Sequence, residues 1–421
     1  MTTVMLSVSE ALARVLADFH PLDSEIVAAE SAVGRVLADS VRASINLPPF
    51  PNSSMDGYAV QATDVAAATA GAPVTLSVIG DIPAGISPTV EVRSGTAARI
   101  MTGAQMPPGA DAVIPVESTD DSGMMMGAKG QMPSAVQILK AVEVGAFVRI
   151  VGEDVKTGDE VLAAGALLRP YDLGVLAALG VGRVPVISRP RVAILSTGDE
   201  LVDIDQTPGA GQIRNVNGYT LAALIHKYGG EPISLGVARD TFEEVHQRLL
   251  AAVEQKVDAI ISSAGVSVGA YDVVKLAVER EGALNFWKVN MRPGKPLVYG
   301  RVRDIPFFGL PGNPVSAIVG FEIFVRPALL KLGGRRRLEK PVVKARLAEA
   351  LHSDGRESYL RAVVVHENGG YTARSAGGQG SNIVSALAHS NAFIIVPAGV
   401  TEVHAGSTLS AWMLDWPEEI F

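Results

Sequence analysis

The stretch from Asp258 to Asp272 combines small, polar and acidic residues in an order suited to holding an anion. An apolar run at its start predicts a buried strand, a loop rich in Ser and Gly follows, and helical spacing begins at Tyr271. Glycines let the backbone approach a ligand, serine hydroxyls donate hydrogen bonds, and a helix start carries partial positive charge. The loop residues expected to bind are Ser263, Gly265, Ser267 and Gly269.

Asp272 lies in the first helical turn beside this loop. A carboxylate next to a phosphate group is electrostatically unfavourable unless a divalent cation lies between them, which makes Asp272 a candidate magnesium ligand. Acidic residues also favour first helical turns because of the helix dipole. For Asp272 alone the dipole is the better explanation, so the magnesium interpretation depends on similar loops after the neighbouring strands.

Residues 191–332 alternate expected strands and helices, which indicates a mainly parallel sheet covered by helices on both faces. Besides the strand of the opening stretch, strands are expected at 192–195, 232–237, 284–289 and 306–310, and helices at 218–228, 242–255 and 315–330. Ligands of such sheets bind beyond the carboxyl ends of the strands. Five loops of this segment are therefore expected at one edge of the sheet.

Charged residues occupy three of the remaining four loops. Glu200 follows the first expected strand and Asp240 follows the second. Arg292 and Lys295 belong to the segment 292–296, where two prolines stiffen the backbone and little entropy is lost when a cation faces an anion.

The last loop, 309–316, joins a strand to a helix. Asn313 is the expected N-cap, Pro314 the first helical residue, and Ser316 lies among the free N–H groups of the first turn. Pro311 and Gly312 shape the loop before the cap. Each loop singly has a turn or capping explanation, but five at one edge favour a binding site.

Composition limits the other classes of function. A chain of 421 residues suggests about two to four domains. The net charge of -8 argues against a nucleic-acid binder. The absence of Cys excludes disulfides, thiolate metal sites and cysteine nucleophiles, and the seven His lack zinc-ligand spacing. Neither a signal peptide nor a membrane-spanning run is expected, so the cytoplasm is the expected location and no membrane partner is expected.

The predicted fold class is a multidomain protein of α/β plus β type. Residues 1–46 and 152–185 are expected to form a discontinuous helical linker domain, because helical spacing begins after Ser7 and returns at 172–180. Short β runs between glycine and proline turns predict a β-rich insert at 47–151. The α/β domain covers 186–334, and a C-terminal β domain covers 335–421.

Other loops carry further polar candidates. Asp56 lies in a proline-flanked loop, and Thr102 begins a loop that follows a strand of the insert. Ser381 belongs to the small-residue loop 377–382, which either closes over a ligand or forms a simple hairpin. Arg356 and Arg361 can reach an oxyanion, although exposed arginines usually do not.

The ordered motifs closely resemble those of the molybdopterin molybdenumtransferase family, which includes the C-terminal region of gephyrin. They are PPFxxSxMDGYA, TGAxxPxGAD, GED, STGDEL, GVSVG, PGKP and GLPGNPVS, and the resemblance covers nearly the whole chain. It implies that adenylylated molybdopterin and molybdate react with magnesium to give molybdenum cofactor and AMP. It also implies a homodimer of four-domain subunits, a molybdopterin-binding α/β domain, a barrel-like C-terminal domain, and a site between the α/β domain and parts of the partner subunit.

The resemblance assigns roles by motif. Glu200, Asp240 and Asp272 would handle magnesium and pyrophosphate. Oxyanions would be held by Lys295, Ser316 and Arg292, and the pterin pocket would be shaped by Pro311 and Pro314. The partner subunit would supply Asp56, Thr102, Arg149 and Asp154, and the C-terminal domain would supply Ser381.

Two positions depart from the family pattern. Ala264 stands where the family usually has a second Gly, which matters if that residue has a positive φ angle. Arg292 stands where Lys is frequent, so the charge is kept but the geometry changes.

The charges suggest a mechanism in which magnesium, Lys295 and Arg292 bring two anions together. One alternative is a pterin or nucleotide adenylyltransferase or phosphohydrolase, which would lack the long β insert. Another is a non-catalytic scaffold that keeps the fold and binds a protein partner. The expected protein partners are an adenylylating enzyme and recipient molybdoenzymes, while the choice between molybdate and tungstate stays open.

Overall fold

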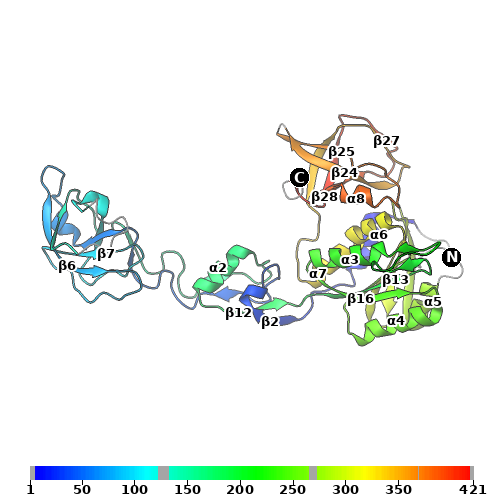
Figure 1. Ribbon diagram of the computed structural model, residues 1–421, viewed down its shortest axis with the longest axis horizontal. Coiled ribbons are helices and arrows are strands. Elements are labelled where there is room, and N and C mark those ends of the chain that lie inside the picture. The colour runs from blue at the N-terminus through cyan, green and yellow to red at the C-terminus, as the bar shows by residue number, and fades with distance from the viewer. Residues whose placement is uncertain (1–4, 122–131, 265–272, 368, 418–421) are drawn as a thin grey trace. The chain divides into compact units, whose positions relative to one another are not determined.

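The computed structural model describes residues 5–121, 132–264, 273–367 and 369–417 (Figure 1). The chain forms two compact units. The first unit contains Met1–Ala38, Gly165–Leu168 and Arg183–Phe421, and the second contains Asp39–Ala164 and Arg169–Gly182.

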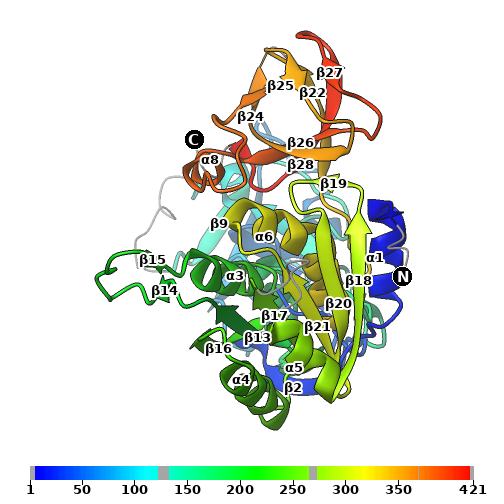
Figure 2. The same cartoon turned by 90° about the vertical axis from the view of Figure 1, so that its right-hand side faces the viewer.

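A seven-stranded sheet organises the first unit (Figure 2). Its order is β1 (Met5–Leu6), β18 (Gly282–Val289), β20 (Pro296–Val302), β21 (Ile305–Leu310), β17 (Ala259–Ser263), β13 (Arg191–Thr197) and β16 (Glu231–Ala238). All neighbours are parallel except β20, which is antiparallel to β18 and β21. The prediction of a mainly parallel sheet is confirmed. Strand β20 was not predicted, because Pro296 at its start and Gly300 inside it weaken the strand pattern of its sequence.

Helices cover both faces of this sheet (Figure 1). They are α3 (Val216–Lys227), α4 (Phe242–Glu254), α5 (Val273–Glu281), α6 (Pro314–Gly320) and α7 (Arg326–Leu332), with a π-helical turn at Phe321–Val325 between the last two. Side chains of β13 alternate between two cores. Val192 and Ile194 face the core shared with α3, α6 and α7, whereas Ala193 and Leu195 face the core shared with α4 and α5.

Helix α1 (Val8–Leu16) differs from its predicted place in a linker domain. Its start is as expected, since Ser7 and Glu10 form a capping box. Its buried residues Val8, Ala11 and Val15 belong to the core of the α/β sheet, and β1 pairs with β18. Helical spacing identified the amphipathic helix but not the surface against which its apolar face is buried.

The predicted linker segment combines one helix with short ladders. The helix is α2 (Pro170–Ala178), in the second unit. Strand β2 (Ser24–Ala28) pairs with β12 (Arg183–Ile187) in the first unit, and β3 (Val41–Arg42) pairs with β11 (Glu160–Leu162) in the second.

The C-terminal part of the first unit is a closed barrel. Its strands are β22 (Val342–Leu347), β24 (Glu357–Glu367), β25 (Gly370–Ser375), β26 (Ala392–Val396) and β28 (Thr408–Met413). Closure comes from the pairing of β24 with both β25 and β26. The barrel-like C-terminal domain is thereby confirmed. Strand β19 (Met291–Arg292), from the α/β part of the unit, pairs in parallel with the first residues of β24.

The second unit contains the β-rich insert. A five-stranded sheet runs in the order β8 (Ala112–Pro115), β5 (Gly57–Val60), β7 (Thr96–Ile100), β6 (Val74–Ile82) and β9 (Ala135–Ile138). Gly57 is required where β5 meets β8, because a Cβ atom there would lie 1.9 Å from the carbonyl oxygen of Ile114. Beside this sheet, β4 (Asn52–Ser53) pairs with β10 (Val148–Arg149).

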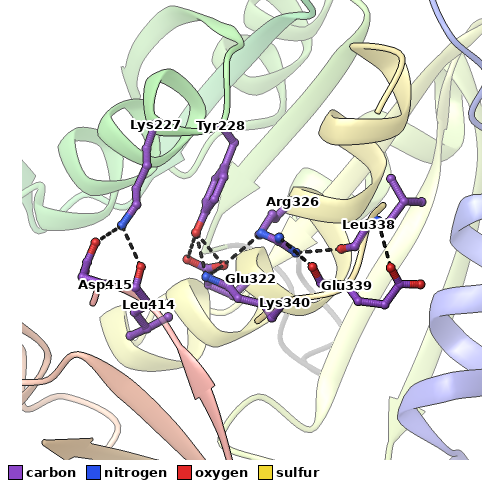
Figure 3. A network of polar contacts seen from close by, with 9 residues as sticks. All are labelled: Lys227, Tyr228, Glu322, Arg326, Leu338, Glu339, Lys340, Leu414 and Asp415. Carbon is purple, nitrogen blue, oxygen red and sulfur yellow. Dashed lines mark hydrogen bonds and ion pairs between the residues drawn. The ribbon is translucent and has the colours of Figure 1, made fainter. Parts of the chain in front are cut away.

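A buried polar network joins the α/β layer to the barrel (Figure 3). The carboxylate of Glu322, in the π-helical turn, accepts from the Tyr228 hydroxyl at 2.8 Å and forms an ion pair with Lys340 Nζ at 2.8 Å. Lys340 also donates to the Tyr228 hydroxyl at 2.7 Å, and Arg326 Nε lies 3.9 Å from Glu322. Burial lowers the pKa of Lys340, and the charge of Glu322 opposes that shift. The network therefore fixes the segment that enters β22 against α3 and the π-helical turn.

Replacing Lys340 by Met should lower the free energy of unfolding by about 3–5 kcal/mol, because the buried Glu322 carboxylate loses its nearest cation. Urea unfolding followed by circular dichroism measures the change. Lys344→Met is a matched control, since Lys344 is an exposed lysine that bonds Ser410 on β28. Equal stability of the two variants would contradict a role for the network in joining the barrel to the α/β layer.

Candidate functional site

The strand directions bring the five predicted loops to one edge of the sheet. Strands β13, β16, β17 and β21 run parallel, and β18 shares their direction because β20 reverses between β18 and β21. Each of the five loops therefore begins at the common carboxyl edge, where open α/β sheets bind ligands. Of the loop after β17, the structure describes Ala264. This part of the prediction is confirmed.

A cavity of about 620 Å³ opens at this edge. Four predicted site residues, Glu200, Ser263, Gly312 and Pro314, contribute to its lining. The rest of the lining comprises Leu201, Ile213, Arg214, Asn215, Val216, Asn217, Ala264, Asn313, Asn382 and Val384. Gly265, Ser267, Gly269 and Asp272 were also predicted to bind here, and they lie outside the described residues.

Carboxylates gather beside the cavity. Asp240 follows β16, and its backbone N–H donates to the Asp199 carboxylate at 3.3 Å. Partial desolvation by neighbouring groups raises the pKa of the Asp240 carboxyl, and the charges of Asp199 and Glu200 raise it further. The Glu200 carboxylate folds over Gly198, where a Cβ atom would lie only 2.5 Å from Glu200 Oε2. Three acidic groups from adjacent strand ends thus share one region of negative potential.

The carboxylates of this acidic region are suitable ligands for a divalent cation, because magnesium prefers oxygen ligands such as carboxylates. The described residues contain no group of three or more acidic or His side chains with a ready metal-binding arrangement. A cation held by Glu200 and Asp240 would therefore need a further ligand. The predicted ligand Asp272 belongs to the segment outside the described residues.

The segment after β18 carries the predicted cations. Lys295 is exposed, and no described carboxylate forms an ion pair with it. Arg292 is half-buried, with Nη1 3.9 Å from Asp354. Lys295 is therefore the cation of this segment that is available to a ligand.

Arg356 is already engaged by protein groups. Its Nε donates to Asp354 at 3.0 Å, and its Nη1 donates to the Met291 carbonyl at 3.0 Å. Hydrogen bonds from Arg356 also hold the pKa of Asp354 below its ordinary value. These contacts fasten the barrel to β19 and disfavour the prediction that Arg356 binds an oxyanion.

Arg361 is fully buried instead of exposed as the sequence analysis assumed. Its side chain is 1% exposed, and Nη2 donates to the carbonyl oxygens of Gly378 and Gly380 at 2.8 and 3.1 Å. Its Nε has no hydrogen-bond partner in the described part of the chain, and burial lowers the pKa of the guanidinium. Arg361 thus holds the loop that leads to Ser381 from inside the barrel.

Ser381 reaches the start of α6 through its backbone. Its carbonyl accepts from the Val315 N–H at 3.0 Å. Asn313 is the N-cap and Pro314 the first helical residue, as predicted, but the Asn313 side chain makes no capping hydrogen bond. The Ser381 carbonyl satisfies a helix N–H instead. Ser316 is buried at 5% exposure and does not line the cavity, and neither does Pro311.

Two asparagines at the start of α3 were missed by the sequence analysis. Asn215 caps the helix, since its Oδ1 accepts from the Gly218 N–H at 2.9 Å and from the Ser196 hydroxyl at 3.1 Å. Asn217 Nδ2 donates to the Ser263 hydroxyl oxygen at 2.7 Å and to the Gly312 carbonyl at 2.8 Å. The available signal was an asparagine before a helical run, which is a typical N-cap.

In the second unit, the predicted pair Asp56 and Thr102 is in direct contact. Asp56 Oδ1 accepts from the Thr102 N–H at 2.7 Å and from its hydroxyl at 2.8 Å. Arg149 is exposed on β10, opposite Asn52 of β4. Asp154 is also exposed, and its backbone N–H donates to the Leu47 carbonyl at 3.0 Å. All four belong to segments that adjoin the 47–56 loop.

Ala264 adopts the left-handed conformation in which a replacement of Gly by Ala matters. Its φ angle is 81°, at the point where β17 leads into the Ser and Gly loop. Glycine adopts this conformation without the steric cost that a Cβ atom brings. The departure from the family pattern therefore places strain at the rim of the cavity.

Three family models match the chain. They are the MoeA N-terminal region (domain I and II) at residues 6–180, a probable molybdopterin binding domain at 193–331, and the MoeA C-terminal region (domain IV) at 344–414. Together they cover most of the sequence. None of the described helices is long and apolar enough to cross a membrane.

Similar proteins span most of the length of the chain. A molybdopterin molybdenumtransferase from Nostoc sp. is 41% identical over 91% of this chain and 87% of its own. One from Haemophilus influenzae is 37% identical over 96% and 98%. A solved structure of a molybdopterin biosynthesis MoeA protein from Pyrococcus horikoshii has a TM-score of 0.79 and 32% identity, covering 97% of this chain and all of its own.

Replacing Ala264 by Gly should raise the free energy of unfolding by up to about 1 kcal/mol. Relief of about 1–2 kcal/mol of left-handed strain exceeds the roughly 0.4–1 kcal/mol that glycine costs through the unfolded chain. Thermal unfolding by calorimetry measures the difference. Ala193→Gly in the extended backbone of β13 is the control and should destabilise. If Ala264→Gly destabilises as much, Ala264 is not strained.

Proposed function

The chain belongs to the molybdopterin molybdenumtransferase family and is thus an enzyme of molybdenum cofactor biosynthesis, and we propose that it inserts molybdate into adenylylated molybdopterin with magnesium. The products would be molybdenum cofactor and AMP. The observation that carries this proposal is the convergence of acidic, cationic and hydroxyl groups on one edge of the α/β sheet. A substrate that combines a pterin with a pyrophosphate requires such a mixed site.

The acidic side of the site would hold the magnesium ion. Glu200 and Asp240 supply carboxylates from adjacent strand ends, and Asp272 is the proposed further ligand. The bound ion would supply positive charge against the pyrophosphate. The raised pKa of Asp240 supports this role, because desolvation and the charges of Asp199 and Glu200 disfavour its ionised form, which a bound cation would stabilise.

The cationic and neutral donors would bind the anionic oxygens. Lys295 is exposed at the carboxyl edge and supplies a compact positive charge, while Arg292 supplies a second charge shared with Asp354. Ser263 supplies a hydroxyl in the cavity lining, and Gly312 and Pro314 shape the adjacent wall. Donors fixed in a folded site stabilise developing negative charge without reorganising during the reaction.

The bond changes are those of a phosphoanhydride cleavage. An oxygen of water or molybdate would form the new bond to phosphorus, the phosphoanhydride P–O bond would break, and AMP would leave. The two sulfurs of the pterin dithiolene would bind the metal of the molybdate substrate, and the oxygen that they displace would leave as water with the two thiol protons. A chain without Cys fits this chemistry, because the sulfur ligands come from the substrate.

We also propose a homodimer in which the partner subunit contributes Asp56 and Thr102. Support comes from exposed apolar side chains near that pair: Phe50 is 38%, Phe147 42% and Ile150 63% exposed. The Phe147 carbonyl accepts from the Ser54 N–H at 2.9 Å, two residues from Asp56. Exposed apolar groups that gather around polar candidates are typical of an interaction surface.

The same family membership supports three further parts of the proposal. The reaction would take place in the cytoplasm. An adenylylating enzyme would provide the substrate, and molybdoenzymes would receive the product.

Lys295→Ala should lower the rate of AMP release by about 100-fold to 1,000-fold, the usual effect of removing one donor to a developing negative charge. The assay uses purified protein, adenylylated molybdopterin, magnesium and molybdate. Lys256→Ala is the control, since this exposed lysine precedes β17 at the opposite edge of the sheet. AMP release that does not require molybdate would favour a phosphohydrolase, and no release by the wild type would favour a scaffold.

Asp240→Asn should raise the melting temperature at pH 7 when magnesium is absent. A raised folded-state pKa means that the folded protein binds this proton more tightly, so its stabilising effect is lost as the pH rises through that pKa. The effect is small because the side chain is exposed. Magnesium should then stabilise the wild type more than the variant.

Asp304→Asn, in the turn between β20 and β21 at the other edge, provides the comparison for this thermal shift experiment. Its response to magnesium should match that of the wild type. Equal magnesium shifts for Asp240→Asn and the wild type would remove Asp240 from the metal site.

A further inference from the structure

The side chain of Asn217 joins two loops that border the cavity. It is buried at 8% exposure in the first turn of α3. Its Nδ2 donates to Ser263 Oγ at the end of β17 and to the Gly312 carbonyl after β21, at 2.7 and 2.8 Å. One amide group therefore fixes the relative position of two cavity walls.

The orientation of this amide follows from its partners. The Gly312 carbonyl can only accept a hydrogen bond, so the NH₂ end of Asn217 must face it. Nδ2 carries two hydrogens, which matches its two acceptors. A flipped amide would bring Oδ1 against the Gly312 carbonyl oxygen, an arrangement of two acceptors without a proton.

This orientation also decides the role of the Ser263 hydroxyl. Because Ser263 Oγ accepts from Asn217, the hydroxyl proton of Ser263 is not used in that contact and is free to point elsewhere. Ser263 is 2% exposed and forms part of the cavity lining. A proton directed into the cavity suits an anionic oxygen, which can only accept.

We propose that Asn217 is a positioning residue that makes Ser263 a hydrogen-bond donor toward an anionic phosphate oxygen in the cavity. This inference rests on the proposed function, because it takes the ligand to be a phosphoanhydride. Asn217 acts through Ser263 and Gly312 and does not itself touch the reacting atoms. Its own Oδ1 is buried and has no hydrogen-bond partner among the described residues, which is the cost of directing both N–H groups at these two loops.

A double-mutant cycle tests this role. Inorganic pyrophosphate is the probe, and calorimetric titration of the whole protein measures its dissociation constant with and without magnesium. Asn217→Ala and Ser263→Ala should each weaken binding by about 10-fold, the value of one hydrogen bond to a charged group. The double variant should bind pyrophosphate about as well as the single variant that binds it less tightly, because both changes remove the same donor. Losses that multiply to about 100-fold would overturn the proposal.

Two further variants separate positioning from folding. Asn217→Asp keeps the shape but offers only acceptors, so it should weaken pyrophosphate binding more than Asn217→Ala does. Asn391→Ala removes a buried amide that bonds the Val364 backbone in the barrel, at 2.7 and 2.8 Å. It should cost stability and leave pyrophosphate binding unchanged. If Asn391→Ala weakens binding as strongly as Asn217→Ala does, the effect is loss of stability and the proposal fails.

The AMP assay separates this inference from the proposed function. With saturating molybdate, Asn217→Ala should raise KM for adenylylated molybdopterin more than it lowers kcat, because Ser263 binds the substrate before the reaction. If the wild type releases AMP but the losses of pyrophosphate affinity in the two single variants multiply in the double variant, the role of Asn217 is overturned and the proposed function stands. Coupled losses in pyrophosphate binding without AMP release by the wild type would overturn the proposed function and leave the role of Asn217 in place.

Discussion

The parallel alignment of strand ends is the constraint on which the site depends. Helices bury both faces of the seven-stranded sheet, so its interior is closed to polar chemistry. Only the edges remain for charged side chains, and the common direction of five strands sends their following loops to the same edge. The segment around Lys295 lies at this edge because it directly follows β18. The antiparallel strand β20 then returns the chain to the opposite edge, from which β21 runs in the common direction.

The polar groups at this edge are arranged for an external partner more than for one another. The carboxylates of Glu200 and Asp240 repel each other, which is a cost in the protein alone. Lys295 lies in a neighbouring loop but forms no described ion pair that would offset this cost. Under the proposed function, the carboxylates and Lys295 would gain their partners from a bound cation and an anionic substrate.

The sequence was sufficient for the features that depend on local pattern. Strand and helix alternation over 191–332, the Ser7 cap and the position of Pro314 all follow from residues close together in the chain. The motif identified Ala264 as a departure that matters if its φ angle is positive, and the structure gives it a positive φ angle. Features that depend on distant partners were missed. The burial of α1 against the α/β sheet, the burial of Arg361, and the capping of α6 by Ser381 each require knowledge of which surfaces meet.

The role of Asn217 could not be predicted from sequence motifs. An asparagine near a helix start is explained well enough as a cap, and Asn215 does cap α3. Only the geometry shows that Asn217, two residues later, is turned toward Ser263 and Gly312, which lie 46 and 95 residues away in the chain.

The barrel is part of the site because it is attached at several separate points. The Glu322 network joins Lys340 to α3, Arg356 joins Asp354 to the Met291 carbonyl, and Ser381 joins Val315 at the start of α6. A single attachment would let the barrel pivot, whereas three attachments on different elements restrict its rotation. The loop that ends at Asn382 therefore forms a cavity wall whose position is set by the same contacts that fold the unit.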